Sequence, residues 1–353
     1  MRRTVLQAAA GMLLLALPLT ACSSSKPPES APSGTGSAGA SAAAVDPNAP
    51  AATGVTAPAK ASKNYNIQFI QGVTGDEFYI SMQCGAEAEA AKLGVTVSTQ
   101  GPQKFDPTLQ RPILDSVTAA QPDAILIAPT DVTAMQGPLQ AAAAAGTKIV
   151  LVDTTTEDPS YAASQIASDN EGGGRAAFDA IKQLNPGGGK VMVMSTDPGI
   201  STVDARVKGF EEAAKADSAF TYLNVQYSHD DPATAANLMG SALQKDPDIV
   251  GVFAANLFSA EGTATGVRQA GKGDAVKVVS FDAGPNQVKA LEEGTVQALV
   301  AQEPGVIGQY GVDMAVAALD GGTVTPKVQT GFTIITKDNV AGDGADAVYK
   351  SSC

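Results

Sequence analysis

Four short apolar segments of this 353-residue chain end in polar side chains that could hold a ligand. The stretch VKVVSFDAGPNQ, residues 276–287, places Phe281 and Asp282 directly before a chain-turning Gly-Pro. The segments AILIAPTD (124–131), KIVLVDTTT (148–156) and GVFAANLFS (251–259) have the same pattern. Carboxylates and amides supply hydrogen-bonding groups, and aromatic rings pack on apolar faces. Four strand ends of this kind indicate a binding site.

Motifs for catalysis, phosphate binding or metal binding are weak. The glycine-rich stretch NPGGGKV (185–191) precedes a strand and has no Ser or Thr after Lys190, so it predicts a turn and not a phosphate loop. His229 is the only histidine, and it has no neighbouring Cys or His to complete a metal site. No GxSxG motif occurs. The sequence therefore predicts no enzyme activity, no metal and no cofactor.

The elements that must position these strand ends alternate along the chain from Asn64. Short runs rich in Ile, Val and Phe are followed by helical segments with Ala, Leu and charged residues, and the rhythm restarts near Gly174. This alternation is typical of α/β proteins with doubly wound parallel sheets, and continuous apolar strands fit sheets that are buried on both faces. Two such sets predict two lobes. Ligands bind outside the carboxyl ends of parallel strands, so we expect a cleft where the two lobes face each other.

The N-terminus indicates export. MRR supplies positive charge, and the apolar run after it is too short for a membrane-spanning helix. The run ends in LTAC, which resembles the lipobox of bacterial lipoproteins and implies that Cys22 is lipidated; the alternative is a plain signal peptide with an incidental cysteine. Residues 23–62 are rich in Ala, Ser, Pro, Gly and Thr, which predicts a flexible tether. We expect the protein outside the cell membrane or in the periplasm, attached only through its lipid.

The net charge limits the expected binding partners, and the cysteines allow a disulfide. The formal net charge is −13 and no basic cluster occurs, which argues against binding to nucleic acid or directly to anionic lipid. Cys84 and Cys353 remain as a possible disulfide pair in an oxidising compartment, or as two unrelated thiols.

From Asn64 to about Asp338 the chain resembles the type I periplasmic binding proteins, in particular the ribose-binding-like branch that serves ABC importers. Motifs that match in order are GDEFYISMQCGAEAEAAKLG, ILIAPTD, VLVDT, IASDN, ARVKGF, VFAAN, VVSFDAGP and AQEPGVIG. The resemblance implies three crossovers between the lobes, near Ser168/Asp169, Gln302/Glu303 and Gly331/Phe332. The expected parts are a signal peptide at 1–21, the lipidated cysteine and tether at 22–63, a first lobe at 64–168 with 303–331, and a second lobe and tail at 169–302 with 332–353.

The same resemblance implies a sugar site in the cleft. Its expected ligand-binding residues are Asp76, Phe78, Tyr79, Asp153, Arg206, Asn256, Phe281, Asp282 and Gln302. Thr154, Ala128 and the pair Leu257 and Phe258 depart from the ribose binder by losing polar groups, which favours a bulkier or less polar polyol such as a hexose, a pentitol or an inositol.

The resemblance predicts a monomeric protein that delivers a monosaccharide or polyol to an ABC transporter permease. Two alternatives stay open. One is a sensor that presents a sugar or a furanosyl autoinducer to a membrane receptor. The other is an exported glycosidase that uses paired acids.

Overall fold

The computed structural model describes residues 52–353. The expected signal peptide and Cys22 lie outside these residues. Within them, no helix is both long enough and apolar enough to cross a membrane.

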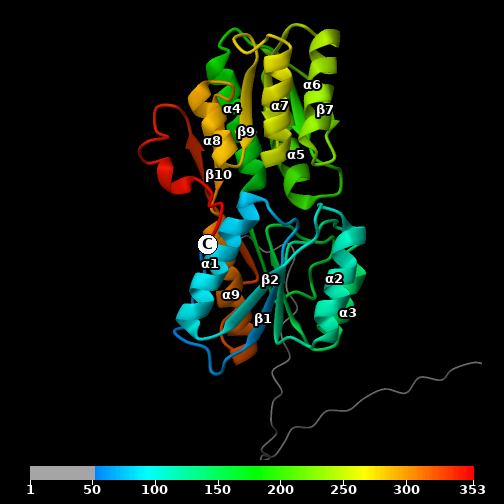
Figure 1. Cartoon of the computed structure of the whole chain (residues 1–353), viewed down its shortest axis with the longest axis vertical. Helices are drawn as coiled ribbons and strands as arrows, with labels where there is room; N and C mark the ends of the chain where they lie inside the picture. Colours follow the sequence, from blue (N-terminus) through cyan, green and yellow to red (C-terminus); the bar gives the residue numbers. More distant parts are fainter. Residues whose placement is uncertain (1–51) are drawn as a thin grey trace, which may run out of the picture. The chain divides into compact units, whose positions relative to one another are not determined.

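Two six-stranded sheets form the centres of two lobes (Figure 1). The first sheet has the order β11-β5-β4-β3-β1-β2, and the second has the order β12-β10-β9-β8-β6-β7. The strands of the first sheet are β1 (Asn66–Ile70), β2 (Thr96–Gln100), β3 (Ala124–Ile127), β4 (Lys148–Val152), β5 (Ser164–Ser168) and β11 (Lys327–Thr330). Those of the second are β6 (Gly189–Ser195), β7 (Phe220–Tyr227), β8 (Ile249–Ala254), β9 (Lys277–Phe281), β10 (Ala298–Gln302) and β12 (Phe332–Ile335). The predicted α/β class with two doubly wound lobes is confirmed.

Helices cover both faces of each sheet. The helices of the first lobe are α1 (Glu77–Leu93), α2 (Pro107–Ala119), α3 (Gln136–Ala144) and α9 (Pro304–Asp320). Those of the second are α4 (Asn170–Leu184), α5 (Ser201–Ala216), α6 (Pro232–Lys245), α7 (Leu257–Gln269) and α8 (Pro285–Glu293). Along β6, Val191 and Val193 belong to the core formed with α4 and α5, whereas Met192 and Met194 belong to the core on the opposite face. This alternation explains why the strands read as continuous apolar runs.

Glycines let pairs of helices approach closely. A Cβ atom on Gly308 of α9 would lie 2.0 Å from the carbonyl oxygen of Met82 on α1. A Cβ atom on Gly174 of α4 would lie 2.1 Å from the carbonyl oxygen of Arg206 on α5. The second contact fixes the position of a site residue, because Arg206 projects from the helix that Gly174 allows to pack so tightly.

The chain passes between the two sheets three times: after Ser168, after Gln302 and at Gly331. β11 pairs parallel to β5 in the first sheet, and β12 pairs antiparallel to β10 in the second. This difference arises because the sheets face each other with their carboxyl ends. A strand that leaves the first sheet at that end enters the second sheet against the direction of its neighbours.

Residues 52–63 correct the expected extent of the tether. The backbone of Ala52 bridges to β11, with hydrogen bonds to Lys327 and Gln329 of 2.9 Å and 2.8 Å. The Ala61 N–H donates to the Leu93 carbonyl at 3.1 Å, and Ser62 bonds to the Asp320 carboxylate. Backbone pairing is open to small residues as well as to large ones, so the polar, small-residue composition did not reveal this attachment to the first lobe.

Candidate ligand-binding site

A cavity lies between the facing ends of the two sheets and encloses about 430 Å³ of empty space, part of it open to solvent. Its walls come from both lobes. They are formed by Val73, Asp76, Phe78, Tyr79, Phe105, Asp153, Thr196, Ile200, Thr202, Val203, Arg206, Asp230, Asn256, Asp282 and Gln302. Eight of the nine residues expected to bind ligand are among them.

Phe281 is the exception and corrects the expectation that it forms a wall. Its ring is fully buried on the α4 side of the second sheet, where a Cβ atom on Gly173 would lie 2.6 Å from it. The guanidinium carbon of Arg206 lies 3.8 Å from the ring centre, a distance at which the cation is attracted to the ring. Phe281 ends β9 and points into the core, because successive strand residues face opposite sides. Phe281 therefore packs against the guanidinium of Arg206 and does not line the cavity itself.

Asp153 and Asp282 occupy equivalent places in the two lobes. Asp153 directly follows β4 and Asp282 directly follows β9, and both have left-handed backbones, with φ of 64° and 77°. The Asp153 N–H donates to Ile166 on the next strand at 2.8 Å, and the Asp282 N–H donates to Val300 at 2.9 Å. A left-handed backbone is uncommon for residues other than glycine and is often found at functional sites. Here it brings each carboxylate to the cavity.

Asp282 is held by three donors of its own lobe and the C-terminal segment. Its Oδ1 accepts from Gln302 Nε2 at 2.6 Å and from the Tyr349 hydroxyl at 3.0 Å. Its Oδ2 accepts from the Leu257 N–H at 3.1 Å. Since each carboxylate oxygen can accept about two hydrogen bonds, Oδ1 is filled and Oδ2 keeps room for one further donor.

Asp153 pairs with an aromatic residue of the same lobe. The Tyr79 hydroxyl donates to Asp153 Oδ2 at 2.7 Å. Burial raises the pKa of Asp153 to about 6, although the nearby Arg206 guanidinium and the Tyr79 hydrogen bond oppose the rise. Burial and the Asp153 carboxylate raise the pKa of Tyr79 well above its usual value, so this phenol stays protonated and remains a donor.

Arg206 is buried in the wall of the cavity. Its Nε donates to Asn170 Oδ1 and its Nη1 donates to the Ala255 carbonyl oxygen, both at 2.8 Å. A guanidinium has five N–H donors, so three remain beyond these bonds. Together with the ring of Phe281 below it, these contacts fix the orientation of the guanidinium in the cavity wall.

Asp76 has a structural role beside its place in the cavity. It caps α1, and its Oδ1 accepts from the Phe78 N–H at 2.7 Å. Burial raises the pKa of Asp76 well above its usual value, and the Asp282 carboxylate raises it further. The cap sets the start of the helix that carries Phe78 and Tyr79, whose rings meet edge to face at 5.2 Å.

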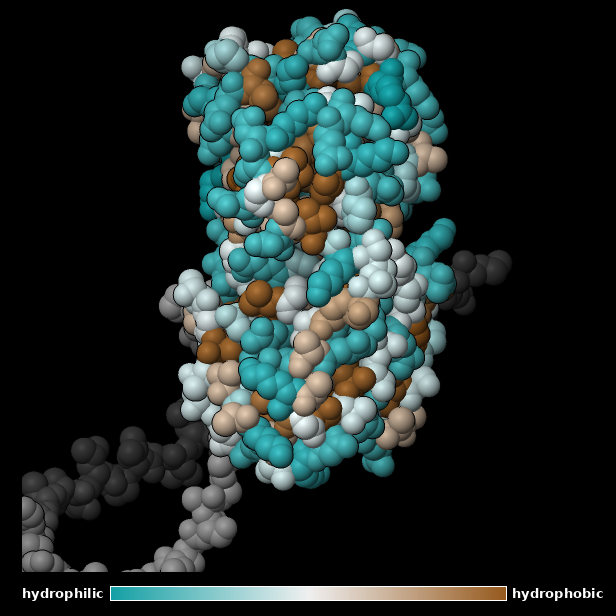
Figure 2. Space-filling view, turned by 60° about the vertical axis from the view of Figure 1, so that its left-hand side comes forward, coloured by the Kyte–Doolittle hydropathy of each residue, from teal (hydrophilic) through white to brown (hydrophobic). Residues whose placement is uncertain are grey.

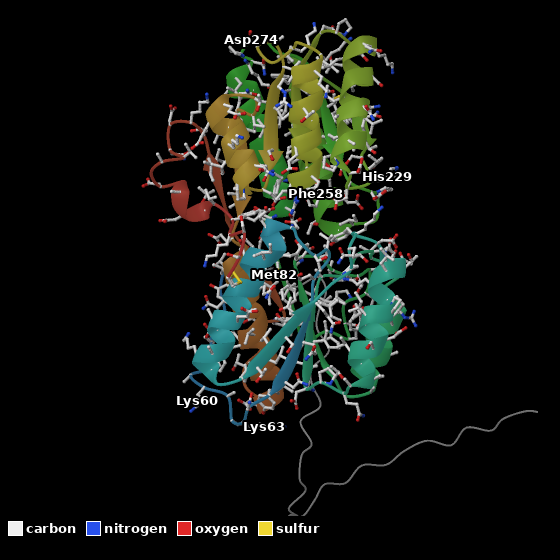
Figure 3. All side chains as sticks on the ribbon, in the orientation of Figure 1. Lys60, Lys63, Met82, His229, Phe258 and Asp274 are labelled. Atoms are coloured by element: carbon white, nitrogen blue, oxygen red, sulfur yellow. A yellow bond between two sulfur atoms is a disulfide. The ribbon has the colours of Figure 1, made fainter. Side chains whose placement is uncertain are left out.

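Asp230 is a cavity residue that the sequence reasoning missed. It accepts from Asn256 Nδ2 at 2.7 Å, and burial raises its pKa to about 7 against the effect of that bond. It follows β7 in the stretch SHDDP, so the strand-end rule that selected Asp153 and Asp282 also applies to it. Its neighbour His229 is exposed and lies at the right-hand side of the junction between the lobes in Figure 3.

The two lobes also touch directly. The Val132 N–H of the first lobe donates to the Gly199 carbonyl oxygen of the second at 3.1 Å. The Thr155 N–H of the first lobe donates to Ser201 Oγ at the start of α5 at 3.0 Å. These bonds hold the lobes together across the cleft. The face in Figure 2 is largely polar, and its apolar side chains lie in small groups on both lobes.

Within residues 52–353, no group of three or more His, Cys, Asp or Glu side chains could hold a metal ion. The polar side chains of the cavity offer hydrogen-bond acceptors and donors beside three aromatic rings, those of Phe78, Tyr79 and Phe105. Two facing α/β lobes, three crossings and a polar cavity between them define a solute-binding protein of the type I periplasmic fold.

Residues 67–323 match the family model described as periplasmic binding protein domain, and the chain belongs to this family. It is similar to the ribose import binding protein of Escherichia coli (strain K12), with 31% identity over 286 residues that cover 81% of this chain and 95% of that protein. It is also similar to a solved ABC transporter solute binding protein from Agrobacterium vitis bound with α-D-tagatopyranose. The two sequences are 41% identical and the structures superpose with a TM-score of 0.80. The match covers 81% of this chain and 100% of that chain. A second Agrobacterium vitis solute binding protein, with bound D-fucose, has 29% identity and a TM-score of 0.77 over 81% of this chain and 100% of that one.

Proposed function

We propose that this protein binds a monosaccharide, preferably a hexose, in the cleft and delivers it to the permease of an ABC importer. The observation that carries the proposal is the cavity itself. It combines carboxylates, an amide pair and a guanidinium with the rings of Phe78 and Tyr79, and both lobes contribute. Sugars present adjacent hydroxyls together with C–H faces, and these two kinds of group match them. The tagatose-bound and fucose-bound relatives support a hexose.

The ligand would stabilise the closed arrangement of the lobes. A ligand shifts a conformational equilibrium only by its different affinity for the two states. Tyr79 and Asp153 lie in the first lobe and Arg206, Asn256 and Asp282 in the second, so a sugar contacts both groups only when the cleft is closed. The three crossings would act as the hinge.

The proposal includes the location of the protein. Cys22 would carry the lipid and the residues after it would tether the lobes to the outer face of the cell membrane, near the permease. A tether raises the effective concentration of the protein at its partner. The protein would act as a monomer, without a cofactor and without converting the sugar; incubation with the bound sugar should give no new product.

A panel of sugars tests the binding function. Thermal shift and titration calorimetry with D-tagatose, D-fucose, D-allose, D-ribose and D-arabinose should reveal at least one ligand. A ligand at a hundred times its Kd stabilises the folded state by about 2.7 kcal/mol. Asp282→Ala should abolish the shift while the unliganded protein stays folded. Asp274→Ala, an exposed acid at the far end of the second lobe, is the matched control and should keep the shift (Figure 3). If no sugar or polyol raises the Tm, the proposal is wrong.

A further inference from the structure

The C-terminal segment, residues 336–353, leaves the second lobe after β12 and ends on the first lobe. Asn339 fixes its first turn, accepting from the Thr336 N–H at 2.7 Å and donating to the Ile334 carbonyl oxygen at 2.9 Å. A short 3-10 helix follows at Ala345–Ala347. The end of the chain then lies beside α1, as Figure 1 shows.

Tyr349 anchors the segment to the second lobe directly behind the cavity. Its N–H donates to the Ala283 carbonyl oxygen at 2.9 Å, and its hydroxyl donates to Asp282 Oδ1 at 3.0 Å. The hydroxyl also accepts from the N–H of Gln302, the residue at which the chain crosses to the first lobe, at 2.9 Å. The side chain is buried, and burial raises the pKa of the phenol well above its usual value, so the hydroxyl keeps its proton.

One residue further, the segment is bound to the first lobe. The Lys350 N–H donates to Ser81 Oγ on α1 at 2.7 Å. Cys353 forms a disulfide with Cys84, one turn further along the same helix, which appears as the yellow bond in Figure 3. The ring of Tyr349 itself lies 5.9 Å from the ring of Phe78, which lines the cavity from α1.

We propose that the C-terminal segment is a fourth connection between the lobes, closed by the Cys84–Cys353 disulfide, and that Tyr349 within it positions Asp282 for the ligand. The positioning role rests on the sugar-binding function proposed above, whereas the connection does not. Tyr349 and Gln302 both donate to Asp282 Oδ1 and together use its two acceptor positions. These bonds fix the rotation of the carboxylate, and with it the direction of the free acceptor position on Oδ2.

The connection also restricts how far the cleft opens. From Tyr349 to Cys353 the chain is four residues long, and a fully extended chain of that length spans at most about 14 Å. Both ends are fixed, one to the second lobe beside Asp282 and the other to α1. An opening that requires a longer path must detach Tyr349 from Asp282. Opening of the cleft and loss of the Asp282 orientation are thereby coupled.

The connection is tested without any ligand. Small-angle X-ray scattering should show a larger radius of gyration for the Cys84→Ser/Cys353→Ser double variant than for the wild-type protein. Reduction of the folded wild-type protein with dithiothreitol should give the same increase, and it needs no substitution; the double variant should not respond to it. An unchanged radius of gyration after reduction would show that the segment does not restrain the lobes.

The positioning role is tested with D-tagatose as the probe and with the rest of the sugar panel if D-tagatose does not bind. Tyr349→Phe keeps the ring beside Phe78 and removes only the hydroxyl, and we expect a Kd about tenfold higher. If Tyr349 contributes packing alone, Tyr349→Phe binds like the wild-type protein and Tyr349→Ala does not, which would overturn the role. If the wild-type protein binds no sugar of the panel, both the proposed function and the positioning role of Tyr349 are wrong. The scattering comparison needs no ligand and tests the fourth connection independently.

Discussion

Sugar binding should depend on pH through Asp230. Burial raises the pKa of this carboxyl to about 7, and the raised value applies to the protein without ligand. A sugar hydroxyl donates more favourably to the ionised carboxylate than to the protonated acid. Binding therefore favours the ionised form, and the Kd should fall as the pH rises through 7.

The size of the effect is worked from the raised pKa values of Asp230 and Asp153, because the third cavity carboxyl with a raised pKa, Asp76, is bonded to the backbone as the cap of α1. Between pH 8 and pH 6, the ionised fraction of a group with a pKa of about 7 falls from about 90% to about 10%, which raises the Kd by up to about tenfold. Asp153, with a pKa of about 6, falls from about 99% to about 50% ionised and adds about a factor of two. The combined change of about twentyfold corresponds to about 1.8 kcal/mol.

Titration calorimetry at pH 6, 7 and 8 measures this change with the tightest-binding sugar of the panel. Asp230→Asn removes the titrating group and keeps the shape of the side chain, so only the twofold change due to Asp153 should remain. Asp274→Asn, at an exposed position, should retain the full pH dependence. A wild-type Kd that is constant between pH 6 and pH 8, or an Asp230→Asn variant with the wild-type slope, would refute the reasoning.

Three further substitutions test the closure and the packing. Ser201→Ala removes the acceptor of the Thr155 N–H across the cleft, and stopped-flow kinetics should show sugar release about three- to tenfold faster, whereas an unchanged release rate would mean that this bond does not support closure. Gly308→Ala places a Cβ atom 2.0 Å from the Met82 carbonyl oxygen, so we expect the free energy of unfolding to fall by about 1–3 kcal/mol in urea titrations, and a wild-type midpoint would contradict such close packing. Burial and the neighbouring Glu89 raise the pKa of Asp313 above its unfolded value, so the folded protein binds this proton more tightly and loses stability as the pH rises toward 8. Asp313→Asn should therefore raise the Tm at pH 8 and raise it less at pH 5, and an equal effect at both pH values would contradict the raised pKa.

Much of the fold was predictable because its local signals agree with its tertiary structure. Buried strands such as β3 and β4 are continuous apolar runs, and Gly94 ends α1 in a left-handed conformation. The attachment of residues 52–63 was not predictable in the same way. It depends on backbone pairing of Ala52 with β11 and on the bonds of Ala61 to Leu93 and of Ser62 to Asp320, whose partners are distant in sequence.

Some residues of the candidate site were also predictable from local sequence signals, and others were not. Asp153 and Asp282 follow from a rule about strand ends, and the rule would also have found Asp230 had it been applied to β7. Arg206 came from the resemblance alone, because nothing in the local sequence of α5 distinguishes a buried arginine from an exposed one. The place of Phe281 against Arg206, and not in the cavity wall, depends on which face of β9 it occupies and on the space left by Gly173.

The matched geometry of Asp153 and Asp282 has a consequence for how the selectivity of the cavity can change. Each acid follows the fourth strand from one edge of its sheet: Asp153 follows β4, counted from the β2 edge, and Asp282 follows β9, counted from the β7 edge. The N–H of each acid donates to the next strand beyond, β5 or β10. The two sheets therefore present the same acid to the cavity from either side. The groups around the two carboxylates differ: Asp153 is bonded to a tyrosine, and Asp282 to a glutamine and a tyrosine from the end of the chain. Selectivity in such a protein can evolve by changing the neighbours of two fixed acceptors, one lobe at a time.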